Sequence, residues 1–311
     1  MGSRRSQGKG AICKDRLDLL VQIERRRGLH MNSIRRDYKL AIALPSSLVS
    51  EIPHLREQTS VIGRIARIAV IHRIDDIYIY RDFPDESKLI RLILTYIETP
   101  QYLRKNLFGI REELRYVGIL PPLRTPHHPS ERRSSRLEAG EFREGVVLSE
   151  NYGEYLVDIG IKTLVKVTGR GPSIGGRTTV LITSIRPMLM GKFAKRGDVK
   201  YYWGYGVHLS RNGLGKLASS NSFDLKFATS RLGSPFRDIE SKFRARLTDA
   251  KSVLVAFGSH KEGIQEILGR KGLEIGEVFD FTANVVPDQG SVTVRTEEAM
   301  SATLALLGML R

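Results

Sequence analysis

The stretch NVVPDQGSVTVRTEEAM occupies residues 284–300 and joins two apolar segments of different character. Residues 278–286, VFDFTANVV, form a continuous apolar run that predicts a buried strand, and residues 297–310 have the apolar content of a buried helix. Between them stand a glycine-containing turn, an arginine and two glutamates. Polar residues placed between two buried elements make this stretch the first candidate for a functional loop.

The segments around this stretch predict an α/β fold. FDLKFATS (223–230) and SVLVAFG (252–258) are also continuous apolar runs, which is typical of parallel strands covered on both faces. Near the N-terminus the pattern runs strand, helix, strand, helix, which opens such a sheet. These four segments are YKLAIAL (38–44), a helical pattern over 55–69, DDIYIYRD (75–82) and a helical pattern over 87–99.

The middle of the chain has another rhythm. Between Glu141 and about Tyr205, short alternating runs such as EYLVDI and TLVKV are separated by turn residues. This predicts a small closed barrel of the OB type inserted into the α/β domain. Basic and aromatic residues alternate in KFAKRGDVKYYWGY (192–205), as they do in nucleic-acid grooves. The alternative is a strand with core aromatics and a solvated face. The candidate RNA-binding residues are Lys192, Lys195, Arg196, Lys200 and Tyr202.

Composition points to a polyanionic partner. The 311 residues include 50 Lys and Arg and 34 Asp and Glu, which gives a formal charge of +16. Such a charge also occurs as a solvated surface. The basic arm at residues 1–36 either contacts RNA or is an extended start of the chain.

Other features of the sequence limit the possible metal sites, the disulfides and the cellular compartment. Cys13 is the single cysteine, so no disulfide and no cysteine-based zinc site can form within one chain. We expect a cytoplasmic protein, because no apolar run approaches the length of a membrane span. His127 and His128 have no partners at metal-ligand spacing, so we expect loop residues and no metal.

Each of the last three predicted strands ends in a small or polar turn: ATSRLGS, FGSHKEG and NVVPDQG. Ligands of open parallel sheets bind beyond the carboxyl ends of the strands, so the three turns can form one site. A structural alternative exists for each: Ser259 and Glu262 fit a capping box, and Thr296 fits a helix N-cap. The final helix is apolar nearly all round, which predicts cover from a second subunit and therefore a homodimer.

These residues resemble the SPOUT superfamily of knotted RNA methyltransferases. The three motifs are ATSRLG, AFGSHKEG and NVVPDQGSVTVRTEEA, in this order. KLAIALPSSL and YVGILPPLRTPHHP, followed by an inserted barrel, resemble its archaeal and eukaryotic putative RNA methyltransferase branch. The resemblance implies a parallel sheet with a trefoil knot, and S-adenosylmethionine as methyl donor. It covers residues 37–311, as a methyltransferase domain at 37–135 and 201–311 with the barrel at 136–200.

The resemblance also implies site residues. In it, residues 284–290 wrap the adenosine, Pro287 fixes the turn and Gly290 allows close backbone approach. Asp288 departs from the family, in which Gly or Asn is common. The implied cofactor-binding residues are Thr229, Ser230, Arg231, Gly258, Ser259, Glu262, Asn284, Val285, Val286, Pro287, Gln289, Gly290, Arg295 and Thr296.

Methylation of a ring nitrogen requires loss of its proton and stabilisation of the anion that remains. Arg231 and Arg295 are candidates for stabilising that anion or for fixing an RNA phosphate, and Glu298 is a candidate base. Each arginine is equally suited to pair with Glu297 or Glu298. Ribosomal RNA is the favoured substrate, with a uridine as the favoured base, and transfer RNA is an alternative.

Two other function classes stay open. One is a non-catalytic RNA-binding or ribosome-assembly protein that uses the barrel and the basic arm. The other is a dinucleotide enzyme, which requires a glycine fingerprint after the first strand; ALPSSLVSE does not supply one.

Overall fold

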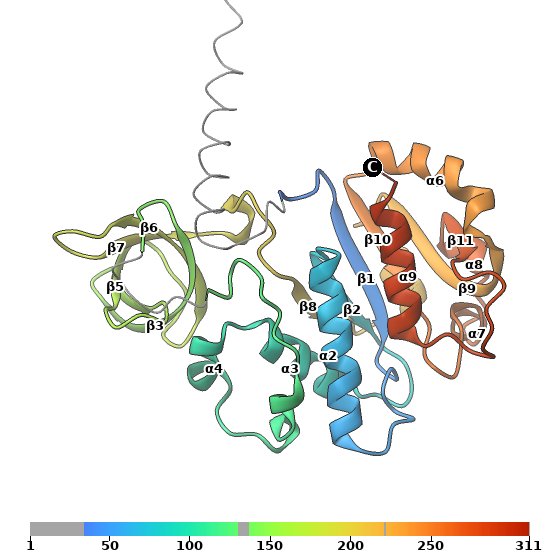
Figure 1. The fold of residues 1–311 in the computed structure, drawn as a ribbon, viewed down its shortest axis with the longest axis horizontal. Helices are drawn as coiled ribbons and strands as arrows, with labels where there is room; N and C mark the ends of the chain where they lie inside the picture. The colour runs from blue at the N-terminus through green and yellow to red at the C-terminus, as the bar shows by residue number, and fades with distance from the viewer. Residues whose placement is uncertain (1–33, 130–136, 221, 311) are drawn as a thin grey trace, which may run out of the picture.

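The computed structural model describes residues 34–129, 137–220 and 222–310. Residues 1–33, which make up most of the predicted basic arm and include Cys13, lie outside them. A six-stranded sheet with the order β11-β9-β10-β1-β2-β8 forms the larger part of the molecule, and all its strand pairs are parallel (Figure 1). The strands are β1 (Lys39–Pro45), β2 (Asp76–Tyr80), β8 (Gly206–Leu209), β9 (Leu225–Pro235), β10 (Ser252–Ala256) and β11 (Phe281–Asn284).

Helices cover both faces of the sheet, which confirms the predicted α/β class. The side chains of β1 alternate between the faces: Leu40, Ile42 and Leu44 pack into one apolar cluster, and Ala41 and Ala43 into the other. The first cluster is completed by α2 (Leu55–Ile71), α3 (Ser87–Glu98), α6 (Phe236–Asp249) and α9 (Thr296–Gly308). The second is completed by α5 (Leu214–Ala218), α7 (Ile264–Gly269) and α8 (Ile275–Val278).

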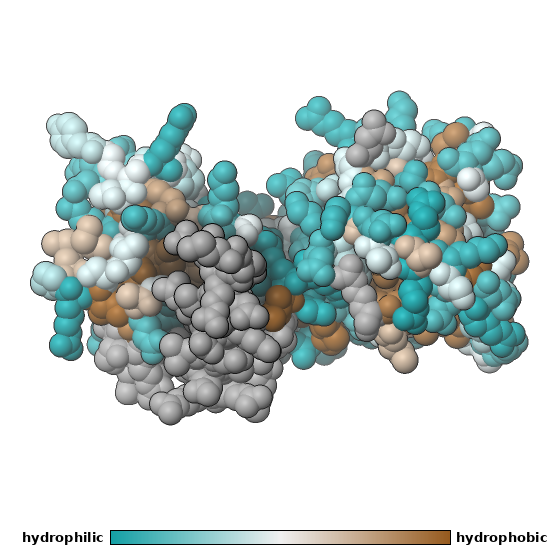
Figure 2. All heavy atoms as spheres, turned by 90° about the horizontal axis from the view of Figure 1, so that it is seen from above, coloured by the Kyte–Doolittle hydropathy of each residue, from teal (hydrophilic) through white to brown (hydrophobic). Residues whose placement is uncertain are grey.

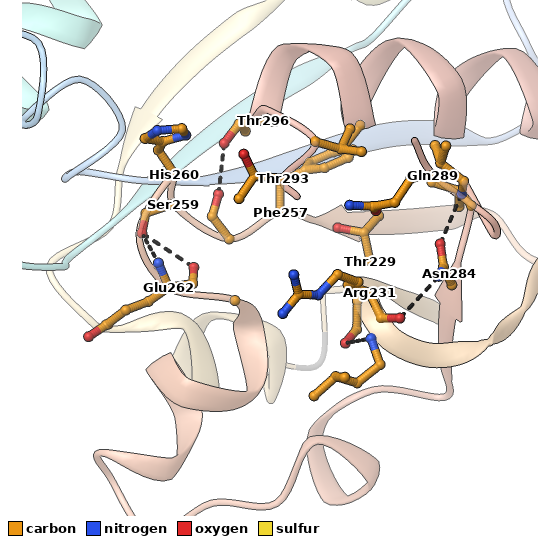
Figure 3. Close-up of a pocket in the computed structure, with 18 of the residues that line it drawn as sticks. Thr229, Arg231, Phe257, Ser259, His260, Glu262, Asn284, Gln289, Thr293 and Thr296 are labelled. Atoms are coloured by element: carbon orange, nitrogen blue, oxygen red, sulfur yellow. Dashed lines mark hydrogen bonds between the residues drawn. The ribbon is translucent and has the colours of Figure 1, made fainter. Parts of the chain in front are cut away.

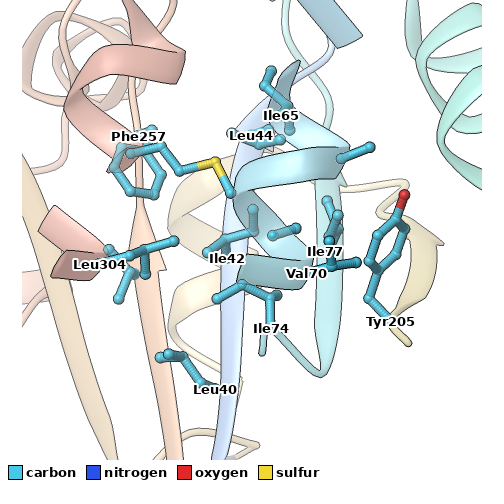
Figure 4. Close-up of a cluster of buried hydrophobic side chains, with 14 of the residues drawn as sticks. Leu40, Ile42, Leu44, Ile65, Val70, Ile74, Ile77, Tyr205, Phe257 and Leu304 are labelled. Carbon is cyan, nitrogen blue, oxygen red and sulfur yellow. The ribbon is translucent and has the colours of Figure 1, made fainter. Parts of the chain in front are cut away.

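The first cluster ties the two ends of the domain together. Leu304 of α9 lies near Leu40 and Ile42 of β1, across from α2 (Figure 4). Consequently α2 and α9 pack side by side in front of β1, although they are far apart in the sequence (Figure 1).

The final helix is less symmetric than its sequence suggests. Met300, Leu304 and Leu307 are buried in the core, whereas Ala305 is exposed and Met309 is 76% exposed. One side of α9 is therefore covered by its own chain. The structure contains a single chain and does not test the predicted homodimer.

The inserted segment forms a closed five-stranded barrel with the order β3-β4-β5-β7-β6. Its first and fourth strands along the chain, β3 and β6, close it by antiparallel pairing, and β5 and β7 pair in parallel. The interior consists of aliphatic side chains such as Val147, Val157 and Ile182. The strands are β3 (Phe142–Asn151), β4 (Glu154–Asp158), β5 (Val165–Thr168), β6 (Arg177–Ser184) and β7 (Met190–Ala194). Connections on either side include α4 (Gln101–Phe108) and the short 3-10 turns η1 (Glu112–Leu114), η2 (Val117–Ile119) and η4 (Arg196–Asp198).

A buried charge network holds the barrel against the α/β domain. Glu98, at the end of α3, and Glu144, on β3, each accept a 2.6 Å hydrogen bond from the guanidinium of Arg177 on β6. Arg196 donates a second cationic hydrogen bond to Glu98, at 2.8 Å, and the Trp203 indole donates to Glu144 at 2.6 Å. Burial opposes ionisation of Glu98, but Arg177 and Arg196 outweigh it and hold the pKa of Glu98 well below its usual value.

Within the described ranges, no helix is long and apolar enough to cross a membrane. The same residues contain no group of three or more His, Cys, Asp or Glu side chains that could hold a metal ion. His127 and His128 lie in a loop, as predicted, and the Nε2 atom of each is within 3.0 Å of the Glu98 carbonyl oxygen. Burial and the neighbouring His127 lower the pKa of His128 to about 3.

Candidate active site

A bulge within β9, at residues 229–233, and the loops after β10 and β11 meet at the carboxyl end of the sheet and enclose a cavity of about 240 Å³. We call it the three-loop cavity. Figure 3 shows Thr229 and Arg231 from the first loop, Ser259 and Glu262 from the second, and Asn284 and Gln289 from the third around its rim. Predicted residues that line it are Thr229, Ser230, Arg231, Gly258, Ser259, Glu262, Asn284, Val285, Val286, Gln289 and Thr296.

The first loop, residues 229–233, lies within β9, so the prediction of a turn after this strand is wrong: Ala228 and Ser234 on either side of it pair with β11. The register shifts after Thr282, so that Ala283 lies opposite Ser234. A Cβ atom at Gly233 would come within 2.9 Å of the Ala283 backbone, and only glycine permits this approach. The Arg231 guanidinium donates to the Val292 carbonyl at 2.9 Å, which fastens the first loop to the third.

The second loop is a closed turn. The Glu262 amide donates to the Ser259 hydroxyl at 2.9 Å, and the Ser259 amide donates to the Glu262 carbonyl at the same distance. Because α7 begins only at Ile264, the capping-box interpretation of Ser259 is wrong: its hydroxyl closes the turn before the helix. A Cβ atom at Gly258 would come within 2.6 Å of the Glu262 carbonyl oxygen, so the turn requires glycine there.

The third loop is held by Asn284. Its side-chain amide donates to the Arg231 carbonyl at 3.0 Å, and its Oδ1 accepts from the Val286 amide at 3.0 Å. Asp288 has a φ of 60°, the left-handed region. Glycine and asparagine adopt this region readily and aspartate tolerates it, which gives a backbone reason for the residue types expected at this position.

The start of α9 is docked onto the second loop. The Thr296 hydroxyl donates to the Gly258 carbonyl at 3.1 Å, and Thr296 is the first residue of the helix. The N-cap is Arg295, so the prediction of Thr296 as N-cap is wrong. Glu298 is exposed, and its carboxylate accepts from the Arg295 amide at 2.9 Å, a role that stabilises the helix start.

Three predicted cofactor residues do not line the three-loop cavity. Pro287 lines a groove between α6 and α9, and Arg295 lines a different cavity between α2 and α9. A Cβ built at Gly290 would meet no protein atom beyond its chain neighbours within 4 Å, so packing within the protein does not require glycine there. Other lining residues lie within the three motifs but were not predicted as site residues: Leu232, Phe257, His260, Thr293 and Ala299 are among them.

Tyr80 holds the backbone of the cavity wall in place at Phe257. Its hydroxyl donates to the Phe257 carbonyl at 2.9 Å, at the point where β10 ends. Complete burial raises the pKa of Tyr80 well above its usual value, so the hydroxyl keeps its proton as a donor.

Comparison with known proteins decides the family. The sequence profile of a family described as "Putative RNA methyltransferase" matches residues 39–307, which include the sheet, the barrel and all three loops. The chain belongs to this family. It is 34% identical to an uncharacterised protein of Halobacterium salinarum over 287 residues, 86% of this chain and 98% of that protein. It is 31% identical to the human 28S rRNA (uridine-N(3))-methyltransferase over 307 residues, 88% of this chain and 78% of that protein. A Drosophila melanogaster protein of the same name is 28% identical over 86% of this chain and 61% of its own length.

The predicted RNA-binding residues of this RNA methyltransferase fall into two groups. Lys192, Lys195 and Lys200 are exposed. Tyr202 is 3% exposed, and its hydroxyl donates to the Ile74 carbonyl at 2.8 Å, so its prediction as an RNA-binding residue is wrong. The guanidinium of Arg196 is engaged by Glu98 in the buried network.

The exposed apolar residues of the barrel lie elsewhere. On its outer side, Leu156 of β4 and Met190 of β7 flank Lys166 of β5 in one cross-strand row, and Tyr152 is fully exposed in the β3–β4 turn. Figure 2 shows pale and hydrophobic residues among hydrophilic ones on the barrel, at the left, and a more hydrophilic surface over the α/β domain.

Proposed function

We propose that this methyltransferase uses S-adenosylmethionine to methylate N3 of a uridine in large-subunit ribosomal RNA. The three-loop cavity carries the proposal, because it lies at the carboxyl ends of three adjacent parallel strands, where ligands of such sheets bind. The name of the human relative suggests the base, the ring position and the RNA. The charge of +16 suits an RNA partner.

The cavity residues fit the proposed cofactor. Val285 and Val286 offer apolar surface for an adenine ring, and Thr229, Asn284 and Gln289 offer polar groups for the ribose and the amino-acid end. When bound, the cofactor supplies an electrophilic methyl group on a sulfonium. The protein has to align the acceptor with it and exclude water. We propose that Arg231, near the cofactor, stabilises the anion that forms when the ring nitrogen loses its proton.

A SPOUT-type knot would explain the third loop. Two hydrogen bonds join residues 284–292 to the first loop, from Asn284 to the Arg231 carbonyl and from Arg231 to the Val292 carbonyl. The chain then continues directly to Thr296 and into the core beside α2. We propose that residues 284–296 pass through the loop formed by the earlier segments.

The barrel is proposed to be an OB-like RNA-binding unit. Five strands close with the third and fifth in parallel, and exposed lysines lie on its surface. We further propose a homodimer through α9. The groove between α6 and α9, about 300 Å³ in volume, is lined by apolar residues including Val285, Pro287 and the exposed Met309, and by the charged residues Arg237, Glu240 and Arg244 of α6.

Nucleoside mass spectrometry tests this function. Large-subunit ribosomal RNA from cells that lack the gene is incubated with the purified protein and S-adenosylmethionine, then digested. We expect N3-methyluridine to appear with the native protein, and to form more slowly with Asn284→Ala when the S-adenosylmethionine concentration is below saturation. The rival function, a non-catalytic RNA-binding or assembly protein, predicts salt-sensitive RNA binding, no new methylated nucleoside and no affinity for the cofactor.

A further inference from the structure

A second cavity adjoins the three-loop cavity. It has a volume of about 410 Å³ and lies between α2, the loop after β1 and the start of α9. We call it the α2–α9 cavity. Of the described residues, His260 and Thr296 line both cavities. Figure 3 shows these two side chains next to each other at one end of the three-loop cavity, away from Asn284.

The lining of the α2–α9 cavity suits a pyrimidine base. Leu48, Ile52 and Val61 provide apolar surface for the faces of a ring. Ser60 provides a hydroxyl for its polar edge. Arg64 and Arg295 provide cationic donors for carbonyl oxygens, and the carboxylates of Glu51, Glu57 and Glu297 also line the cavity. Arg64 is held by Glu297, whose carboxylate lies 3.0 Å away and is nearly buried.

A base bound in the α2–α9 cavity would explain why Arg295 lies there. It was predicted as a residue that stabilises an anion, and it lines the α2–α9 cavity rather than the three-loop cavity. A uracil ring that loses its N3 proton places negative charge on its two carbonyl oxygens. A guanidinium in the cavity that holds the ring stabilises this charge.

We propose that the α2–α9 cavity binds the acceptor pyrimidine and that His260 takes up its ring proton. This inference rests on the proposed function. The acceptor nitrogen has to reach the methyl carbon, so it must lie where the two cavities meet, and a side chain shared by both cavities contacts it there. The Thr296 hydroxyl is engaged with the Gly258 carbonyl, which leaves the His260 imidazole as the shared side chain suited to accept a proton.

The proposed step balances in atoms and charge. The N3–H bond of the base breaks, and the proton moves to an imidazole nitrogen of His260. The electron pair left on N3 forms the new bond to the methyl carbon. The carbon–sulfur bond breaks with its electron pair remaining on sulfur, so that the positive charge of the sulfonium is replaced by that of the imidazolium.

Four variants test the proposal. Ser60→Trp fills the α2–α9 cavity from α2, and Arg56→Trp is its control, since Arg56 lies on the same helix and lines neither cavity. His260→Ala removes the imidazole. His54→Ala is its control, because His54 is exposed and also lines neither cavity.

The first readout is binding. Saturation-transfer NMR with uridine 5′-monophosphate, in the presence of S-adenosylhomocysteine, should show contact in the native protein and in Arg56→Trp. We expect the contact to be lost in Ser60→Trp while its calorimetric affinity for S-adenosylhomocysteine stays within twofold. If the nucleotide still contacts Ser60→Trp, the assignment of the α2–α9 cavity as the acceptor site is wrong. Absence of S-adenosylhomocysteine binding in the native protein would instead refute the proposed function.

The second readout is the rate of methyl transfer to the ribosomal RNA of gene-deleted cells. We expect His260→Ala to be slower by about 100-fold or more, the usual contribution of a general base, and added imidazole to raise its rate at least about tenfold. His54→Ala should match the native protein. A His260→Ala rate within about threefold of native, or a reduced rate that imidazole does not raise, would refute the proton transfer to His260.

Discussion

Replacing Arg177 with methionine should lower the free energy of unfolding by breaking ion pairs between the barrel and the methyltransferase domain. Both cavities should stay intact. Arg177 bridges Glu98 and Glu144 at 2.6 Å each, and both carboxylate side chains are only 4% exposed. Removing one partner of a buried ion pair costs about 3–5 kcal/mol, since it leaves a buried charge uncompensated. Glu98 keeps Arg196, and Glu144 keeps the Trp203 indole, so we expect the lower end, about 3 kcal/mol.

Calorimetric unfolding measures this loss. A change of 1 kcal/mol shifts the Tm of a domain of this size by about 2–4 °C, so Arg177→Met should lower the Tm by about 6–12 °C. The control is Arg170→Met, an exposed barrel residue, which should stay within about 2 °C. A second change, Glu144→Gln in the Arg177→Met background, should restore part of the stability, because Arg177 is the cation that pairs with the buried Glu144 carboxylate.

The pH dependence has a defined sign. Because the pKa of Glu98 is depressed in the folded protein, its ion pairs stabilise the fold above the usual glutamate pKa, and this stabilisation is lost as the pH falls below it. The Tm difference between Arg177→Met and the native protein should therefore be largest near neutral pH and shrink below about pH 4.5. A Tm difference under about 2 °C at pH 7, or one that grows in acid, would refute the buried-network reasoning.

Three further results are expected. Asn284→Ala removes two 3.0 Å hydrogen bonds that shape the third loop, so the calorimetric affinity for S-adenosylhomocysteine should fall by about tenfold; an unchanged affinity would mean that the loop is held by other contacts. Asp288→Gly relieves a left-handed φ of 60° and should raise stability by up to about 1 kcal/mol in thermal unfolding; a lower Tm would contradict this. Lys192→Glu on the barrel should weaken RNA binding and reduce the salt slope of the affinity by about 1, whereas Lys242→Glu on α6 should not; equal effects would argue against RNA contact at Lys192.

The sheet was predictable because its strands are covered on both faces. FDLKFATS, SVLVAFG and YKLAIAL are continuous apolar runs, and each contains or overlaps a strand of the structure. β8 was missed because GVHL is a four-residue edge strand with half its side chains exposed, which leaves no apolar run to detect. Likewise, the eight residues of α4 have too little apolar periodicity to be distinguished from a loop.

The aromatic residues after the barrel show the limit of sequence patterns. Basic and aromatic residues alternate in a core segment just as they do in an RNA groove. Long-range contacts decided between the two: the Tyr202 hydroxyl reaches the Ile74 carbonyl, and the Trp203 indole reaches Glu144. His260 was missed for a related reason. Its proposed role depends on the cavity that it lines together with α2, which lies far from it in the sequence.

The most direct test of the central claim is calorimetric titration of the native protein with S-adenosylmethionine and S-adenosylhomocysteine, with and without ribosomal RNA. We expect one site per chain with a dissociation constant in the micromolar range, a free energy of about −8 kcal/mol. No heat of binding for either compound, with RNA absent and with RNA present, would contradict it.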